Sequence, residues 1–367
     1  MQTEFSDYIR AIAHIPGISA YRLRQLREQL RGIRDIEHVS QSELIADFGW
    51  PLALAKRFAE WRRHGTFIEL REKSSSQGIR QILRGDKDYP QELLTIHDAP
   101  ECLFVRGSIP AFPAIAFVGS RRNTSYGKRV IETLLDPLAH YGLTLVSGLA
   151  LGIDGLAHER ALEKGMPTVA ILGTGVDDES IYPREHYVLA QRILAAGGAL
   201  VSEYPPGTSS RKEHFPQRNR LIAGMSLATI VIEAGMDSGS LITARLALEQ
   251  GREVLAVPGP IWSPASFGCH QIIKLGARLC ESSQDILDAL ALDRPALAQQ
   301  TREQLPLTPD EQALYASLEE PTDIDTLCAR SGRPSPQVLA GLSLLELKGY
   351  IRHEQGLWHR AIGCPKR

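Results

Sequence analysis

The sequence has no Cys-x-x-Cys pair, although it contains five cysteines: Cys102, Cys269, Cys280, Cys328 and Cys364. Cysteines scattered in this way argue against a structural zinc site and against a dense disulfide framework, so we expect reduced thiols and no metal. No apolar run reaches the roughly 18 residues of a membrane span, and the first residues lack the apolar stretch of a secretory signal peptide. We therefore expect a cytoplasmic protein that does not contact the membrane.

An excess of charge of one sign is also missing. The 367 residues carry 41 Lys plus Arg against 43 Asp plus Glu, which leaves a net charge of −2. This balance excludes a global polycation, so any nucleic-acid site must be a local patch. Hydrophobic residues make up 43% of the chain, enough for two or three domains with cores of their own.

Hydrophobic periodicity and composition divide the chain into segments of different character. We expect a helical domain over 1–75, a connecting segment over 76–110 with a short strand at 102–106, an α/β domain over 111–290, a Pro/Gln/Ala-rich linker over 291–306, and a winged helix over 307–367.

The two flanking segments each contain a feature that could serve nucleic-acid binding. Residues 12–26 resemble a helix-hairpin-helix, whose turn offers amides to phosphate, but we favour a plain helical turn because Ser19 stands where a second glycine is usual. The expected recognition helix of the winged helix, 335–348, has Lys348 as its single base. We therefore favour a protein-contact role for it over the reading of DNA bases.

The central segment alternates apolar runs with helix-length stretches. Near-continuous apolar strands of this kind are typical of a parallel sheet that helices cover on both faces. The fold class we expect is α/β, a Rossmann-like doubly wound parallel sheet with helical flanks. The expected strands are 114–118, 143–146, 168–172, 199–201, 228–232 and 253–257.

Glycines and hydroxyl side chains follow these strands, at the edge where open α/β sheets bind ligands. Small residues allow a ligand to approach the backbone, and helix N-termini attract anions, so the pattern predicts a phosphate site. The alternative is that the glycines only make tight turns. Asp154 and Glu233 could be catalytic acids, but we favour a bracing role for Asp154 because it has no paired base. The candidate residues are Gly119, Ser120, Arg121, Ser147, Gly148, Ser238, Gly239 and Ser240.

A second cluster, 210–220, combines four cations with one aromatic ring and a single acid. Cations neutralise phosphates and an aromatic face stacks a base, which is the combination that single-stranded nucleic acid requires. The alternative is a solvated basic helix end with Phe215 in the core. NAD binding is disfavoured because the first turn reads GSRRNT rather than G-x-G-x-x-G, and no G-x-S-x-G elbow indicates a hydrolase.

Eight ordered motifs in the α/β segment together resemble the DNA-processing protein A (DprA/Smf) family. They are FVGSR at 117–121, YG at 126–127, VSGLALGID at 146–154, SE at 202–203, FPQRNR at 215–220, IAG at 222–224, SGSLITA at 238–244 and AVPG at 256–259.

The resemblance implies a non-enzymatic cytosolic protein of natural transformation that needs no cofactor. Such a protein binds incoming single-stranded DNA, protects it and loads the recombinase RecA, and its Rossmann-like domain forms a homodimer. The flanks resemble family members with an N-terminal SAM-like domain and a C-terminal winged helix. By motif, Gly119, Ser120 and Arg121 would hold phosphates; Lys212 and Phe215 would supply charge and a stacking face; Arg218, Asn219 and Arg220 would extend the pocket; and Ser147, Gly148 and Ser238 to Ser240 would line it.

The chain departs from the family pattern at His270, where many members have Asn, and this affects a surface that we expect to contribute to dimerisation. Two other functions remain open. A phosphoribohydrolase-like enzyme would need a P-G-G-x-G-T-x-x-E motif, whereas residues 233–243 read EAGMDSGSLIT. A protein-interaction scaffold would depend mainly on the winged helix.

Overall fold

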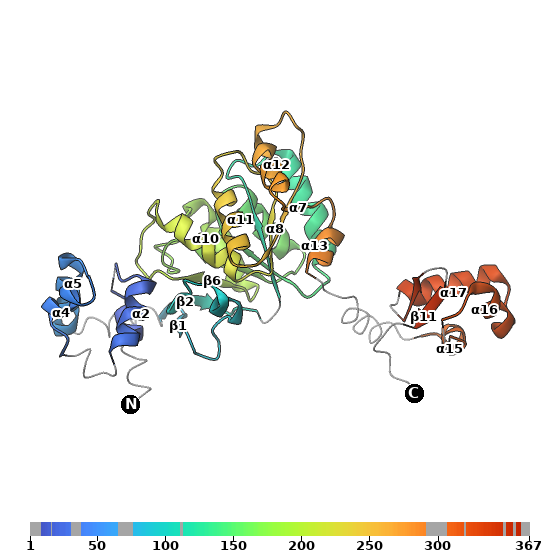
Figure 1. Cartoon of the computed structure of the whole chain (residues 1–367), viewed down its shortest axis with the longest axis horizontal. Helices are drawn as coiled ribbons and strands as arrows, with labels where there is room; N and C mark the ends of the chain where they lie inside the picture. Colours follow the sequence, from blue (N-terminus) through green and yellow to red (C-terminus); the bar gives the residue numbers. More distant parts are fainter. Residues whose placement is uncertain are drawn as a thin grey trace. The chain divides into compact units, whose positions relative to one another are not determined.

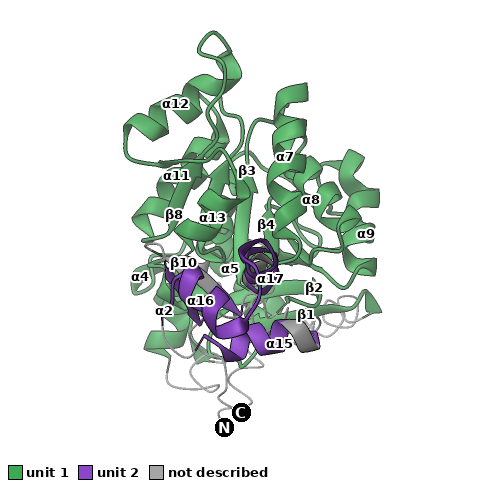
Figure 2. Cartoon of the chain, turned by 90° about the vertical axis from the view of Figure 1, so that its right-hand side faces the viewer, with its two compact units in different colours: residues 1–290 green, residues 291–367 purple. Residues whose placement is uncertain are grey.

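The computed structural model describes residues 9–15, 17–30, 38–64, 76–110, 113–290, 307–318, 321–347, 350–354 and 357–360. The chain divides into two compact units, Met1–Leu290 and Ala291–Arg367 (Figure 2). Cys102, Cys269, Cys280 and Cys328 have free thiols, and Cys364 lies outside the described residues.

The first unit is built on a nine-stranded sheet in the order β1-β2-β6-β5-β4-β3-β7-β8-β9 (Figure 1). The seven strands from β6 to β9 run parallel, and β1 and β2 add an antiparallel edge. The expected doubly wound parallel sheet is thus confirmed, and residues 76–110 contribute two strands to it. The strands are β1 (Ile79–Leu83), β2 (Cys102–Gly107), β3 (Ala114–Val118), β4 (Thr144–Ser147), β5 (Thr168–Leu172), β6 (Ala199–Ser202), β7 (Ala228–Val231), β8 (Glu253–Ala256) and β9 (Arg278–Leu279).

Helices cover both faces of the sheet, and this explains why the strand sequences are apolar throughout. In β5, Ala170 and Leu172 belong to a core that includes side chains of α9, whereas Val169 and Ile171 belong to a core shared with α10 and α11. Helices α7, α8 and α9 pack in sequence on the first face. The helices are α7 (Ser125–Leu138), α8 (Ile153–Glu163), α9 (Tyr187–Ala195), α10 (His214–Gly224), α11 (Gly239–Glu249), α12 (Phe267–Lys274) and α13 (Ser283–Ala289).

The order of the strands creates one topological switch point. From β3 the chain moves outward through β4, β5 and β6, and then returns to place β7 on the other side of β3. The loops that follow β3 and β7 therefore leave in opposite directions at neighbouring strand ends. A crevice forms there at the carboxyl edge, which is where open α/β sheets bind ligands.

The N-terminal helices α2 (Ala20–Gln29), α4 (Gln41–Ala46) and α5 (Leu52–His64) share the core on the α9 side of the sheet. A buried carboxylate, Glu101, anchors α2, because it accepts hydrogen bonds from Arg24 at 3.1 Å and Arg27 at 2.9 Å, and it also accepts one from Arg84 at 3.2 Å. In the proposed helix-hairpin-helix turn, the Ser19 hydroxyl accepts a hydrogen bond from the Arg22 amide and caps α2. Pro16 lies outside the described residues.

The second unit has the expected winged-helix elements and a core of its own, which includes Leu327, Leu342 and Trp358. Its first helix starts at a capping box between Thr308 and Glu311. Lys348 lies outside the described residues, and the exposed described face of the recognition helix carries Leu339 and Leu344 but no cation. The elements are α15 (Pro309–Ala316), α16 (Ile324–Ser331), α17 (Ser335–Leu347), β10 (Ile351–Glu354) and β11 (Leu357–Arg360).

Candidate functional site

A cavity of about 960 Å³ opens at the switch point between β3 and β7. The turn after β3, the start of α10 and the start of α11 form most of its wall. Ten of the predicted residues line it: Gly119, Ser120, Arg121, Lys212, Phe215, Arg218, Asn219, Ser238, Gly239 and Ser240.

The turn after β3 is built so that its backbone and its arginines face the cavity. The Ser120 amide donates to the carbonyl of Glu233 at 2.7 Å, and the Ser120 hydroxyl accepts from the Arg122 amide at 3.1 Å. Gly119 is required for close packing, because a methyl group there would lie 2.6 Å from Cγ1 of Ile153. The result is a fixed turn that leaves Arg121 and Arg122 exposed.

The buried acid Glu233 ties this turn to the end of β7. One carboxylate oxygen accepts from the Thr124 amide at 2.9 Å and the other from the Thr124 hydroxyl at 2.5 Å. The same hydroxyl oxygen accepts from the Tyr126 amide at 3.1 Å and so caps α7. These contacts give Glu233 a positioning role and support bracing rather than acid catalysis.

Phe215 forms a half-buried platform in the cavity wall with cations beside it. The Arg121 guanidinium carbon lies 5.3 Å from the Phe215 ring centroid, within the range of a cation–π contact. Tyr182 packs against the same ring, with 5.8 Å between centroids. Lys212 is exposed and has no ion pair with any described residue. Sequence reasoning missed Tyr182, because it lies in a loop after β5 that no periodic pattern marks.

The start of α10 is held in place by its neighbours. His214 Nδ1 donates to the carbonyl of Gly173 at 3.0 Å, and Tyr204 stacks on the His214 ring with 4.0 Å between centroids. Burial lowers the pKa of His214 and so favours the neutral form of the ring. This packing sets the orientation of the first turn, from which Phe215 projects.

Arg218 and Asp154 are buried neighbours of opposite charge under the cavity, and each is hydrogen-bonded to backbone rather than to the other. Nη1 of Arg218 donates to the carbonyl of Gly148 at 2.7 Å and also to that of Ile171, while Asp154 accepts from the Gly148 amide at 3.0 Å. Burial lowers the pKa of Arg218 to about 10, against the attraction of Asp154. Burial likewise raises the pKa of Asp154, and Arg218 opposes that shift. Each charge therefore makes the burial of the other tolerable.

Three predicted residues do not line the cavity. Ser147 is buried and its hydroxyl donates to the carbonyl of Phe117 at 2.6 Å. Gly148 lies behind the Arg218 pair, where a methyl group would come within 2.6 Å of Nη2 of Arg218. Arg220 forms ion pairs with Asp98 at 2.8 Å and Glu203 at 2.6 Å. Arg220 points away from the cavity that Arg218 lines, because residues two apart in a helix do not share a face.

The remaining predicted residues join the starts of α10 and α11. The Asn219 side-chain amide donates to the carbonyl of Gly239 at 3.3 Å. The Ser238 hydroxyl accepts from the Ser240 amide at 3.4 Å and caps α11, so the positive end of that helix faces the cavity. The lining thus holds Arg121, Arg122, Lys212 and Arg218 against Asp154 and Asp237.

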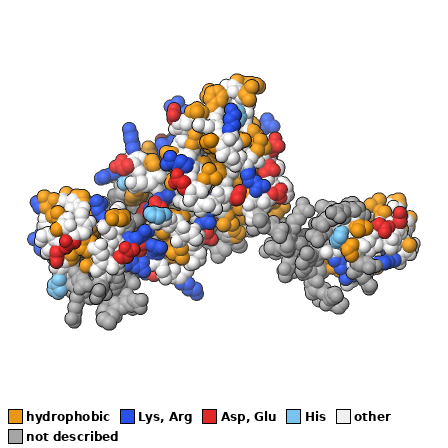
Figure 3. Space-filling view, in the orientation of Figure 1, with side chains coloured by type: hydrophobic (Ala, Val, Ile, Leu, Met, Phe, Trp, Pro, Cys, Tyr) orange, Lys and Arg blue, Asp and Glu red, His pale blue; other side chains and the backbone are white. Residues whose placement is uncertain are grey.

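This excess of cations is local. On the face that Figure 3 shows, Lys and Arg side chains are interspersed with Asp and Glu, as the net charge of −2 predicts.

Among the described residues, no group of three or more His, Cys, Asp or Glu side chains is placed to hold a metal. None of the described helices combines the length and apolarity that a membrane span needs.

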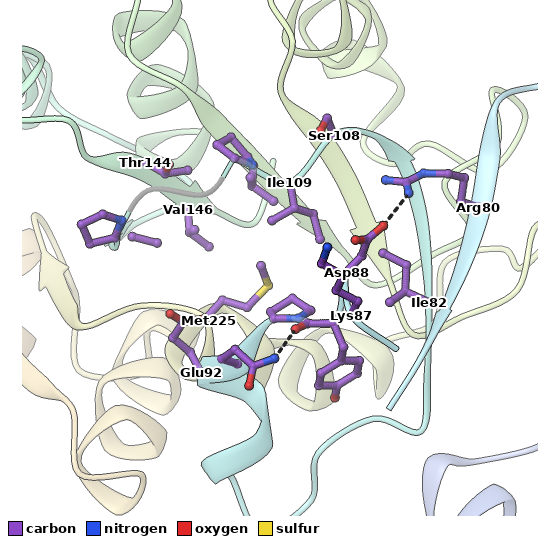
Figure 4. Close-up of a pocket in the computed structure, with 17 residues that line it drawn as sticks. Arg80, Ile82, Lys87, Asp88, Glu92, Ser108, Ile109, Thr144, Val146 and Met225 are labelled. Atoms are coloured by element: carbon purple, nitrogen blue, oxygen red, sulfur yellow. Dashed lines mark hydrogen bonds and ion pairs between the residues drawn. The ribbon is translucent and has the colours of Figure 1, made fainter. Parts of the chain in front are cut away.

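A second cavity, of about 690 Å³, lies at the opposite end of the strands (Figure 4). Thr144 at the start of β4 and Met225 line it, and Arg80 at its edge is paired with Asp88 at 3.2 Å. It lies at the amino ends of the strands, and it gathers no set of helix N-termini. We therefore place the functional site at the first cavity.

The family model of DNA recombination-mediator protein A matches residues 80–291, and the model of the DprA winged helix domain matches residues 298–356. The chain belongs to the DprA/Smf family. Protein Smf of Escherichia coli (strain K12) is 40% identical over 319 residues, which is 84% of each chain. DNA processing protein DprA of Streptococcus pneumoniae is 45% identical over 204 residues, 55% of this chain and 71% of that one.

Two solved DprA structures share the fold. The X-ray structure of DprA from Streptococcus pneumoniae covers 78% of this chain and 97% of its own, with a TM-score of 0.63 and 33% identity. A structure of DprA from Helicobacter pylori, described by its single-stranded DNA binding mode, covers 59% of this chain and 96% of its own, with a TM-score of 0.52 and 30% identity. The DprA/Smf family is thus one of DNA-processing recombination mediators.

Proposed function

We propose that this protein binds single-stranded DNA in the cavity between β3 and β7, without catalysis. Phosphates contact Arg121, Lys212 and the N-terminal amides of α11, and a base stacks on Phe215. The observation that carries the proposal is the 5.3 Å contact of Arg121 with the Phe215 ring, beside the exposed Lys212. The binding mode described for the Helicobacter pylori relative supports it.

The geometry favours a single strand over a duplex. A base paired in a duplex is already stacked on its neighbours, so its face is not available to Phe215, whereas an unpaired base can be turned onto the ring. The four cations of the lining recognise the backbone, which every DNA sequence shares. Binding is therefore expected to depend weakly on base sequence and strongly on salt.

A fluorescence-anisotropy titration with labelled oligo-dT and the matching duplex tests this function. We expect tighter binding of the single strand, and an affinity that falls steeply between roughly 50 and 200 mM salt. Lys212→Ala should weaken binding by roughly tenfold and lower the salt slope by about one, because it removes one phosphate contact. Folded wild-type protein that binds neither DNA, or binds without regard to salt, would contradict the proposal.

We further propose that the protein acts as a homodimer that protects the strand and loads RecA onto it. The support for dimerisation is the edge strand β9, which pairs on one side with β8. Leu275, shortly before β9, is 75% exposed, and Leu279, within β9, is 43% exposed. His270, which replaces the usual Asn, contacts the backbone of Gly259 at 3.0 Å and so holds the loop before α12.

Analytical ultracentrifugation of Leu279→Asp tests the dimer, because a charge on an apolar interface disfavours association. We expect wild type to sediment as a dimer and the variant as a monomer with unchanged circular dichroism. A RecA strand-exchange assay on coated single-stranded DNA tests loading, where wild type should shorten the lag before exchange. Wild type that sediments as a monomer, or leaves the lag unchanged, counts against the corresponding proposal.

A further inference from the structure

The loop between β8 and α12 presents two large apolar side chains to solvent. Ile261 and Trp262 are each 79% exposed. Figure 3 shows hydrophobic atoms gathered at the top of the sheet unit, over α12 and the loop before it. A tryptophan this exposed has little packing to stabilise it, so its position is better explained by contact with a ligand than by folding.

The loop is held in shape on both sides of the exposed pair. The Tyr126 hydroxyl donates to the carbonyl of Pro258 at 2.5 Å, and His270 contacts the Gly259 backbone. The Ser263 amide donates to the carbonyl of Pro260 at 2.9 Å, and the Ala234 amide donates to the carbonyl of Ala265 at 2.7 Å. Trp262 is therefore carried by an anchored loop, as a stacking platform requires.

These anchors connect the loop to a cationic stretch and to the wall of the cavity. Tyr126 belongs to the stretch 120–129, which reads SRRNTSYGKR and contains no acid. Its four cations, Arg121, Arg122, Lys128 and Arg129, are all exposed. None of these four cations forms an ion pair with a described residue. Ala234, the other anchor, directly precedes Gly235 in the cavity lining. Of the two acids in that lining, Asp154 is buried and Asp237 is exposed.

We propose that Trp262 is a second stacking platform, on which a single strand of DNA that leaves the cavity places a further base. Lys128 and Arg129 neutralise the phosphates between the two platforms. This inference rests on the proposed binding of single-stranded DNA in the cavity. The exposed cations beside the loop, with no acid among them, favour a nucleic acid as the occupant, because its phosphates need counter-charges. A protein partner would instead be expected to bind where the exposed loop is surrounded by apolar surface alone.

The test compares short and long strands, because only a long strand can reach both platforms. Oligo-dT of about 4 and about 16 nucleotides spans the site sizes usual for single-strand binders. Trp262→Leu keeps an apolar side chain but removes the aromatic face, and Trp262→Phe keeps a stacking face. We expect Trp262→Leu to bind the long strand about tenfold more weakly than wild type does, and to bind the short strand as tightly as wild type does. Trp262→Phe should recover most of the lost affinity for the long strand.

The outcomes separate this inference from the function on which it rests. If wild type binds neither strand, the proposed function fails. If wild type binds both and Trp262→Leu binds the long strand as tightly as wild type, the cavity function stands and the second platform is wrong. Sedimentation is measured on the same variants: a Trp262→Leu protein that loses self-association along with long-strand affinity identifies the loop as a protein interface and also overturns the inference. Val188→Ala, in α9 and away from both the cavity and β9, is the control for loss of exposed apolar area, because that side chain is 67% exposed.

Discussion

Arg121→Glu is expected to weaken the binding of labelled oligo-dT by about a hundredfold, equivalent to about 2.7 kcal/mol. The substitution removes a phosphate contact, places a negative charge against the strand, and ends the contact with Phe215 that lies at 5.3 Å. The slope of log affinity against log salt should fall by about one. Because Arg121 is exposed, the unfolding midpoint should change little.

Arg192→Glu is the matched control for this experiment. Arg192 is an exposed arginine in the last turn of α9, and it lines neither cavity. The control makes the same change in net charge, so equal losses of affinity in the two variants would mean that binding follows overall charge, and the site would then be wrong. Arg121→Lys should retain part of the affinity, because it keeps the charge but not the planar group that stacks on Phe215.

Arg218→Leu is expected to lower the free energy of unfolding by about 3–5 kcal/mol. Arg218 is 4% exposed, and its loss leaves the carboxylate of Asp154 buried without a counter-charge. It also leaves the carbonyls of Gly148 and Ile171 without this donor. Urea unfolding measures the effect, and any folded variant should bind oligo-dT poorly because the wall of the cavity is built on this pair.

The pH dependence of this defect identifies its cause. Without Arg218, burial raises the pKa of Asp154 further, so the folded state takes up a proton more readily than the unfolded state does. The lost stability should therefore be partly regained as the pH falls from 8 toward 5. Adding Asp154→Asn to Arg218→Leu should recover stability at pH 8 for the same reason. A defect that is equal at both pH values and unchanged by Asp154→Asn would show that Asp154 is not its source.

The strand ends could be predicted from the sequence because the apolar runs have clear limits. Runs such as 114–118 and 168–172 coincide with β3 and β5, so the residues after them were placed correctly at the carboxyl edge. The strand β9 has two residues, and β1 is five residues long with a mixed pattern, so neither gives a periodic signal. Each is defined by its pairing with an adjacent strand, β1 with β2 and β9 with β8, rather than by a pattern of its own.

The basic cluster 210–220 shows the limit of reasoning from composition. Its cations look alike in the sequence, but Lys212 is exposed at the cavity, Arg218 is buried beneath it, and Arg220 is paired with Asp98 and Glu203. The helical period separates Arg218 from Arg220, and this could have been foreseen. The acids that neutralise Arg220 lie on other segments, so the sequence does not reveal that its charge is already balanced.

The amino-acid sequence by itself determined the fold class, the edge of the sheet that holds the site, and the residue types that meet there, because all three follow from local patterns of hydrophobic, glycine and cationic residues. Only the tertiary structure decided which charges are free. It brought Arg218 within electrostatic reach of Asp154, tied Glu233 to Thr124 and placed Arg121 over Phe215. Each of these contacts joins residues from different strand ends, and only the folding of the sheet brings them together.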